Sequence, residues 1–246
     1  MSRYFIEVAY KGTRYSGFQI QENANTVQAE IEKAFFVLQR QPVSLTGSSR
    51  TDAGVHALQN YFHFDIQEPL NPHFVYKMNS ILPADIVIKN LYEMPATAHS
   101  RFDAIGREYE YNIYLYKNPF LKEVAYYYPY KLDIAVMQEA AEWVTGQTYF
   151  FAFSKTNTQV KNFNCTISLS EWIIKEDRLI YTIKGNRFLR GMVRLLTATM
   201  LKIGRGKYSL DEFKELFGTE DKKCGFSVPA HGLFLKEVHF PSQYFL

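Results

Sequence analysis

The chain contains only two cysteines, Cys165 and Cys224, and no C-x-x-C pair. Their spacing excludes a disulfide framework and the common zinc motifs. The six histidines include no H-E-x-x-H, so we expect no metal site. No stretch approaches the roughly 20 apolar residues that span a bilayer, and the N-terminus alternates polar and apolar residues without a signal-peptide core. We therefore expect a cytoplasmic protein with no membrane segment.

The sequence also lacks G-x-G-x-x-G, G-x-x-x-x-G-K-[ST] and G-x-S-x-G. Dinucleotide-binding, P-loop and serine-hydrolase sites thus lack their local signatures, and we expect no cofactor.

Positive charge is concentrated in one segment. The net charge is only +3, but residues 184–207 hold seven Lys and Arg residues and no Asp or Glu. A solvated basic surface is the usual reading of such a run, but the absence of any acid favours phosphate contacts. Hydrophobic residues make up 47% of the 246 residues, as in globular proteins with one large or two small domains.

Hydrophobic periodicity predicts an α+β fold. Helical spacing predicts helices over residues 27–38 after the N-cap Thr26, after Pro72, between Asp133 and Gly146, over 188–203, and after the N-cap Ser209. Alternation predicts strands over residues 3–10, 43–45, 60–66, 86–92, 107–116, 165–175, 178–184 and 233–240. We expect two similar α+β halves with mainly antiparallel sheets flanked by helices, an N-terminal domain over 1–105 and a C-terminal domain over 106–246. A cleft between them is the default place for an active site.

The loop over residues 47–56 is the strongest candidate for chemistry. Arg50 precedes Asp52 by two residues, and Gly54 follows it by two. A guanidinium beside a carboxylate favours the ionised form, which suits a nucleophile or a base. Gly54 allows a tight turn, and His56 is expected to position the loop. From spacing alone, a structural ion pair in a turn is the commoner arrangement.

Residues 47–57, G-S-S-R-T-D-A-G-V-H-A, resemble the signature of the tRNA pseudouridine synthase A family. The resemblance extends over nearly the whole chain. The further matching segments are Y-K-G at 10–12 with Y-x-G-F-Q at 15–19, N-S-I-L-P at 79–83, S-R-F-D-A at 100–104, R-x-Y-x-Y at 107–111, F-L-R-G-M-V-R at 188–194 and P-A-H-G-L at 229–233. The chain departs from the family pattern at Lys11, Phe18, Glu108 and Gly191.

The resemblance implies a tRNA isomerase, a homodimer, that converts uridine to pseudouridine in the anticodon stem-loop, at positions 38, 39 and 40. It implies that Asp52 is the catalytic carboxylate, that Tyr109 stacks on the flipped uracil and that Arg194 pairs with Asp52. Arg50 would contact the RNA backbone beside the flipped nucleotide. Further substrate contacts are expected from Arg101, Leu233, Arg187, Arg190, Lys11 and Arg14.

The residues themselves support part of this implication. In the helix expected over 188–203, Arg187, Arg190 and Arg194 would lie on one side, opposite an apolar stripe. Base flipping calls for an aromatic platform such as Tyr109. The sequence does not decide whether Asp52 adds to C1′, adds to C6 or removes the 2′ proton. Two other functions stay open, a catalytically silent tRNA-binding or tRNA-folding module and a hydrolase in which Asp52 activates water.

Overall fold

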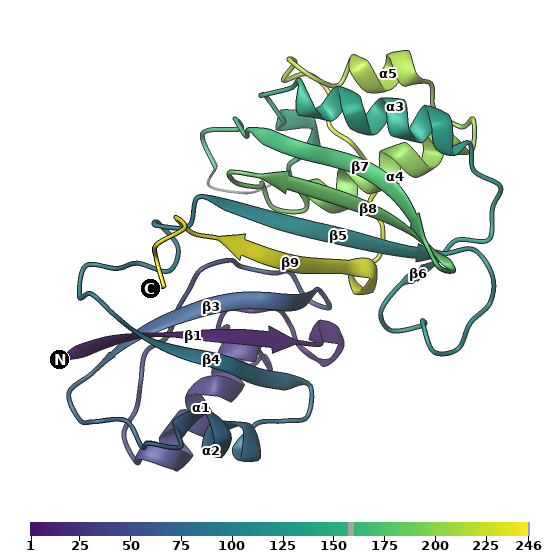
Figure 1. The fold of residues 1–246 in the computed structure, drawn as a ribbon. Coiled ribbons are helices and arrows are strands. Elements are labelled where there is room, and N and C mark those ends of the chain that lie inside the picture. The colour runs from purple at the N-terminus through teal and green to yellow at the C-terminus, as the bar shows by residue number, and fades with distance from the viewer. Residues whose placement is uncertain (157–159, 246) are drawn as a thin grey trace. The chain divides into compact units, whose positions relative to one another are not determined.

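The computed structural model describes residues 1–156 and 160–245, which form two compact units (Figure 1). Unit 1 contains Met1–Ile105 together with Phe234–Leu246, and unit 2 contains Gly106–Leu233. Each unit combines a mainly antiparallel sheet with helices, so the expected α+β class is confirmed. Among the described residues, no helix is both long enough and apolar enough to cross a bilayer.

The sheet of unit 1 is built around β1, which runs antiparallel to both of its neighbours, β3 and β4. Its strands are β1 (Ser2–Tyr10), β2 (Thr46–Gly47), β3 (His56–Ile66), β4 (Ile86–Met94) and β9 (Leu233–His239). The short β2 adds to β3 in the antiparallel sense, whereas β9 pairs with β3 in parallel, with His56 opposite Phe234.

The position of β9 corrects the predicted division of the chain. A C-terminal domain over 106–246 would include this strand, but the chain from Phe234 onward packs with unit 1. Two contacts explain the difference. The strand pairs with β3, and the aromatic rings of Phe240 and Tyr244 lie 6.2 and 6.0 Å from the ring of Phe5 in β1. This burial stabilises the C-terminal segment on the first sheet.

The opposite face of that sheet carries two helices, α1 (Val27–Gln39) and α2 (Phe74–Ile81). Successive strand residues point to opposite faces, so β3 presents Phe64 to the helices and His63 to the other side. Phe35 of α1 packs edge-to-face against Phe64 and Phe74, with ring centroids 5.1 and 5.5 Å apart. Short 3-10 helices complete the fold in both units, at Gly12–Arg14, Phe151–Phe153 and Ala230–Gly232.

Unit 2 contains a mainly antiparallel sheet covered by helices on one face (Figure 1). Its strands are β5 (Gly106–Tyr114), β6 (Tyr126–Tyr127), β7 (Ile167–Lys175) and β8 (Arg178–Gly185), with β6 parallel to β5. Its helices are α3 (Ile134–Thr145), α4 (Met192–Gly204) and α5 (Leu210–Lys214). Trp172 of β7 joins the layers, because its backbone N–H donates to Gln138 Oε1 in α3 and its Nε1–H donates to Met200 Sδ in α4.

The predicted N-caps Thr26 and Ser209 are confirmed, and the structure adds a third N-cap, Asp133. Thr26 Oγ1 accepts the Ala29 N–H at 3.3 Å, and Asp133 Oδ1 accepts two backbone N–H groups of the first turn of α3. Ser209 and Glu212 form a reciprocal capping box at α5. Each cap satisfies N–H groups that have no partner inside the helix.

Two predictions differ from the structure, one in where a helix begins and the other in a strand that does not form. The helix expected over 188–203 begins at Met192, because Gly191 has a left-handed backbone with φ of +77°. Arg187 and Arg190 therefore precede the helix, and they do not share a helical face with Arg194. Residues 43–45 do not form a strand, because side chains of α1 bind the backbone of Leu45: Glu32 accepts its N–H and Gln28 donates to its carbonyl.

Candidate active site

The Asp52 loop joins β2 to β3 in unit 1, and its backbone is fixed on both sides of Asp52. Before Asp52, Asn60 Nδ2 donates to the Ser49 carbonyl at 2.8 Å, and Thr51 Oγ1 lies 2.8 Å from the Tyr10 hydroxyl. These polar groups are buried. After Asp52, its carbonyl accepts the Val55 N–H at 3.1 Å and closes a turn. The loop therefore presents Asp52 from a rigid frame, as a catalytic group requires.

The loop over residues 11–19 packs tightly against the Asp52 loop at two glycines. A Cβ on Gly12 would lie 1.9 Å from the Val55 carbonyl oxygen. Gly17 has φ of +110°, and its Cβ would lie 3.1 Å from the Thr51 carbonyl oxygen. A side chain at either glycine would displace the backbone that carries Asp52.

Gly54 and His56 have the roles that the sequence predicts for them. Gly54 has φ of +78°, which a residue with a side chain rarely adopts, and this makes the turn after Asp52 possible. His56 is buried, and its Nδ1 accepts the Gly12 N–H at 2.9 Å. The imidazole thereby holds the two loops together.

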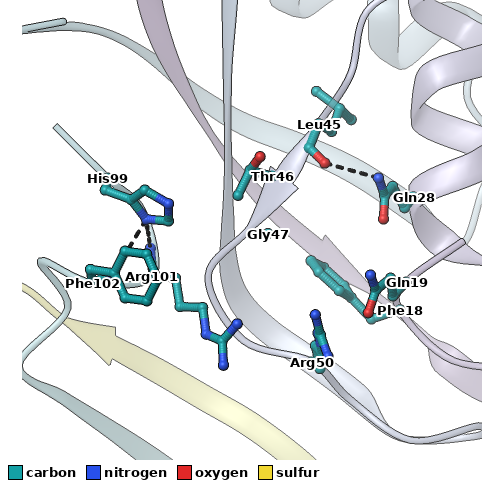
Figure 2. A pocket seen from close by; sticks show the side chains of 10 residues that line it. All are labelled: Phe18, Gln19, Gln28, Leu45, Thr46, Gly47, Arg50, His99, Arg101 and Phe102. Carbon is teal, nitrogen blue, oxygen red and sulfur yellow. Dashed lines mark hydrogen bonds between the residues drawn. The ribbon is translucent and has the colours of Figure 1, made fainter. Parts of the chain in front are cut away.

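Arg50 and Arg101, both predicted substrate contacts, line one pocket of about 200 Å³ in unit 1 (Figure 2). Both side chains are exposed. The residues that line the pocket are Phe18, Gln19, Gln28, Leu45, Thr46, Gly47, Arg50, His99, Arg101 and Phe102. None of these ten is acidic, so the pocket is electropositive and suits an anionic ligand such as a phosphate. The sequence gives no functional signal for His99, and it marks Phe102 only as part of the S-R-F-D-A segment at 100–104.

Two other predicted contacts, Lys11 and Arg14, lie beside Asp85 of unit 1. Arg14 Nε is 2.8 Å from Asp85 Oδ2, and the Tyr15 hydroxyl donates to Asp85 Oδ1 at 2.6 Å. The Lys11 N–H donates to the Asp85 carbonyl at 2.9 Å. Asp85 therefore anchors the loop that carries both basic side chains, and their contacts with RNA stay predictions.

Tyr109 lies on β5 of unit 2, half-buried, with its ring edge-to-face to Phe188 at 5.0 Å. Two residues further along, on the same face of the strand, the Tyr111 hydroxyl donates to the Pro229 carbonyl at 2.8 Å. Burial raises the pKa of Tyr111 and keeps it a neutral donor, although the nearby Arg194 acts in the opposite direction.

Arg194 of α4 is held by the segment that ends in the P-A-H-G-L motif. Its Nε–H donates to the Val228 carbonyl at 2.8 Å. A Cβ on Gly232 would lie 2.6 Å from Cζ of Tyr111, so the motif passes directly over that ring. Leu233 follows and is only 7% exposed, which leaves little of its side chain available to a ligand.

The two other arginines of the basic segment lie in the irregular chain before α4. Arg187 is half-buried and Arg190 is exposed, and the Arg190 carbonyl accepts the Lys155 N–H at 3.1 Å.

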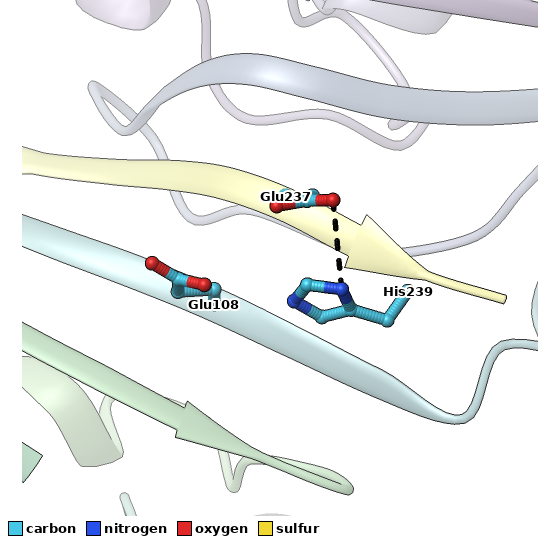
Figure 3. A group of neighbouring side chains, drawn as sticks. All are labelled: Glu108, Glu237 and His239. Atoms are coloured by element: carbon cyan, nitrogen blue, oxygen red, sulfur yellow. Dashed lines mark ion pairs between the residues drawn. The ribbon is translucent and has the colours of Figure 1, made fainter. Parts of the chain in front are cut away.

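Glu108, one of the residues that depart from the family pattern, lies on β5 opposite Lys184 of β8. Figure 3 shows two side chains of β9 that lie close together, with His239 Nδ1 3.5 Å from Glu237 Oε1.

The predicted residues are divided between the two units. Unit 1 holds Asp52, Arg50 and Arg101 with Lys11 and Arg14. Unit 2 holds the rest of the predicted set, namely Tyr109, Arg194, Arg187, Arg190 and Leu233. The pairing of Asp52 with Arg194 joins residues of different units and stays a prediction.

Comparison with known proteins identifies the family. The family model described as tRNA pseudouridine synthase matches residues 6–103 and 140–241. The chain is 42% identical over 248 residues to tRNA pseudouridine synthase A of Parabacteroides distasonis, covering all of this chain and 98% of that protein. It is 40% identical to tRNA pseudouridine synthase A of Porphyromonas gingivalis and 38% identical to that of an Exiguobacterium species, covering 100% and 98% of this chain and of each relative. The chain therefore belongs to the tRNA pseudouridine synthase family, whose members are isomerases.

Proposed function

We propose that this protein isomerises uridine to pseudouridine in the anticodon stem-loop of tRNA, at positions 38, 39 and 40, with Asp52 as the catalytic carboxylate. The observation that carries the proposal is the Asp52 loop, whose backbone is fixed by Tyr10, Asn60 and two glycines beside an electropositive pocket. Full-length similarity to tRNA pseudouridine synthases supports the reaction class.

The reaction is balanced without an external reagent. The bond between uracil N1 and C1′ breaks, the base turns, and C5 forms a bond to C1′. The hydrogen on C5 leaves as a proton and N1 gains one, so the product is an isomer of the substrate. A carboxylate is sufficient for such chemistry as a nucleophile or a base.

The other residues of the proposed site bind and position the RNA. The target base is paired or stacked in the free tRNA, so it has to leave the stack before it can react. Tyr109 replaces the lost stacking, and Arg194 pairs with Asp52. Arg50 and Arg101 bind phosphates next to the flipped nucleotide, which fixes the register of the strand.

Tritium release tests this proposal. The substrate is an unmodified tRNA transcript with tritium at uridine C5, because formation of the new bond at C5 must expel that label. We expect release by the wild type and none by Asp52→Asn, with tRNA affinity unchanged. The matched control is Asp177→Asn, an exposed carboxylate in the turn between β7 and β8. Its release should equal that of the wild type.

The alternative functions give different results. A catalytically silent tRNA-binding module would bind the transcript tightly and release no tritium. A hydrolase would release free uracil, which chromatography of the reaction detects. By resemblance we also propose that the enzyme is a cytoplasmic homodimer, and sedimentation of the purified protein measures the oligomeric state.

A further inference from the structure

We propose that Phe102, supported by His99, is a stacking platform for a second, unpaired nucleobase of the bound RNA, separate from the base that reacts. The inference rests on the proposed function, because it takes RNA as the ligand of the pocket between Arg50 and Arg101. It assigns a base-binding role to a residue outside the proposed catalytic set.

Phe102 is 75% exposed although it is a large apolar side chain at the rim of a polar pocket (Figure 2). Its ring packs on the imidazole of His99, with centroids 4.2 Å apart and planes inclined by 34°. One face of the phenyl ring is therefore supported, while most of the ring is open to solvent. Burial of that exposed ring by a ligand would be favourable by the hydrophobic effect.

The turn that carries Phe102 is rigid. His99 Nδ1 accepts the backbone N–H groups of Arg101 and Phe102 at 3.1 and 3.3 Å, and the His99 N–H donates to Asp103 Oδ2 at 2.8 Å. Ser100 is fully buried, and its Oγ donates to the Thr46 carbonyl at 3.0 Å. A ring fixed in this way loses little conformational freedom on binding, which favours a ligand-binding role.

The charges around Phe102 identify the kind of ligand. The Arg101 guanidinium lies 5.7 Å from the ring centroid of Phe102, and Arg50 lines the same pocket. Two cations beside an exposed aromatic ring match a nucleotide, which offers a phosphate and a flat base together. Gln19 and Gln28, also at the pocket, offer donors and acceptors for a base edge or a ribose hydroxyl.

The test uses variants of Phe102 that separate stacking from apolar contact. Phe102→Leu keeps a side chain of similar hydrophobicity without an aromatic face, whereas Phe102→Trp enlarges that face. Tyr76→Leu and Tyr76→Trp are the matched controls, because Tyr76 is 77% exposed on α2 of the same unit and does not line the pocket. Affinity is measured by filter binding with unmodified tRNA transcript.

We expect Phe102→Leu to weaken tRNA binding by about one order of magnitude and Phe102→Trp to bind at least as tightly as the wild type. The same tRNA should quench the indole fluorescence that Phe102→Trp adds to the wild-type signal. It should leave the indole added by Tyr76→Trp unquenched, and Tyr76→Leu should bind as the wild type does.

Wild-type affinity in Phe102→Leu, or an unquenched indole in Phe102→Trp, would overturn the platform. An equal loss of tRNA affinity in Phe102→Leu and Phe102→Trp would also overturn it, because the shape of the side chain would then matter and its aromatic face would not. Tritium release by the same proteins separates this inference from the proposed function. Indole quenching in Phe102→Trp without tritium release by the wild type would support the stacking platform and contradict the isomerase function. Tritium release by the wild type, with no effect of the Phe102 variants on binding, would support the isomerase function and contradict the platform.

Discussion

Gly12→Ala should reduce turnover strongly, although residue 12 lies far from Asp52 in the sequence. The added methyl group would lie 1.9 Å from the Val55 carbonyl oxygen and 2.6 Å from the Val55 carbonyl carbon. Real Cβ contacts are not shorter than 3.0 Å, so the two backbone segments have to separate by about 1 Å. The obstacle is backbone on both sides, so no side-chain rotation relieves it.

That displacement acts on the catalytic loop. The Val55 N–H donates to the Asp52 carbonyl, and the Gly12 N–H donates to His56 Nδ1, so both hydrogen bonds lie in the region that moves. A misplacement of about 1 Å at a reacting group costs about 100-fold in rate. Overpacking costs about 1–3 kcal/mol in the free energy of unfolding, which a protein of this size can tolerate.

The assay is tritium release at saturating tRNA, together with urea unfolding to show that the variant is folded. We expect kcat to fall by about 100-fold, with a native far-ultraviolet spectrum. Gly225→Ala is the matched control, because a Cβ there has no atom within 4 Å and the backbone φ is not positive. Turnover within threefold of the wild type in a folded Gly12→Ala protein would refute the argument that this contact positions Asp52.

Three further predictions concern other residues. Burial and the nearby His99 lower the pKa of His63 to about 4, whereas the unfolded chain binds that proton with a pKa near 6.5. Between pH 4 and 6.5 the unfolded chain therefore binds more protons than the folded protein does. The free energy of unfolding should decrease by about 3 kcal/mol as the pH falls from 6.5 to 4. Urea titrations at several pH values should find a smaller decrease in His63→Asn. Thr26→Ala removes the N-cap of α1 and should cost about 1 kcal/mol of stability, while Thr26→Ser should keep it; equal stability of both variants would contradict the capping role. Tyr109→Ala should lower kcat/KM by about tenfold through lost stacking of about 1–3 kcal/mol, and Tyr109→Phe should retain activity; a large loss in Tyr109→Phe would assign the role to the hydroxyl instead.

Features that depend on residues close together in the chain are predicted correctly from the sequence. Thr26 and Ser209 are N-caps because a side-chain oxygen reaches a backbone N–H group three residues away. The alternating pattern near Tyr109 produces a strand for the same local reason. The glycine after Asp52 adopts a positive φ, as the turn requires.

The predictions fail where a distant contact or a single backbone conformation decides the outcome. The apolar pattern before Gly191 continues the helical period, but the left-handed backbone of that glycine delays the start of α4. Residues 43–45 have the composition of a strand, yet side chains of α1 bind the backbone of Leu45. In both cases the local preference is weaker than the interaction that replaces it.

The sequence by itself determined the family, the caps, most of the elements and the short motif that presents Asp52, because each depends on residue types at fixed short spacings. Only the tertiary structure decided that Gly12 and Gly17 press against the Asp52 loop, and that Arg50, Arg101 and Phe102 meet at one pocket. It also placed β9 beside β3. These are tertiary contacts between residues that lie tens to hundreds of positions apart in the sequence. Composition and periodicity describe only local patterns, so they do not predict such contacts.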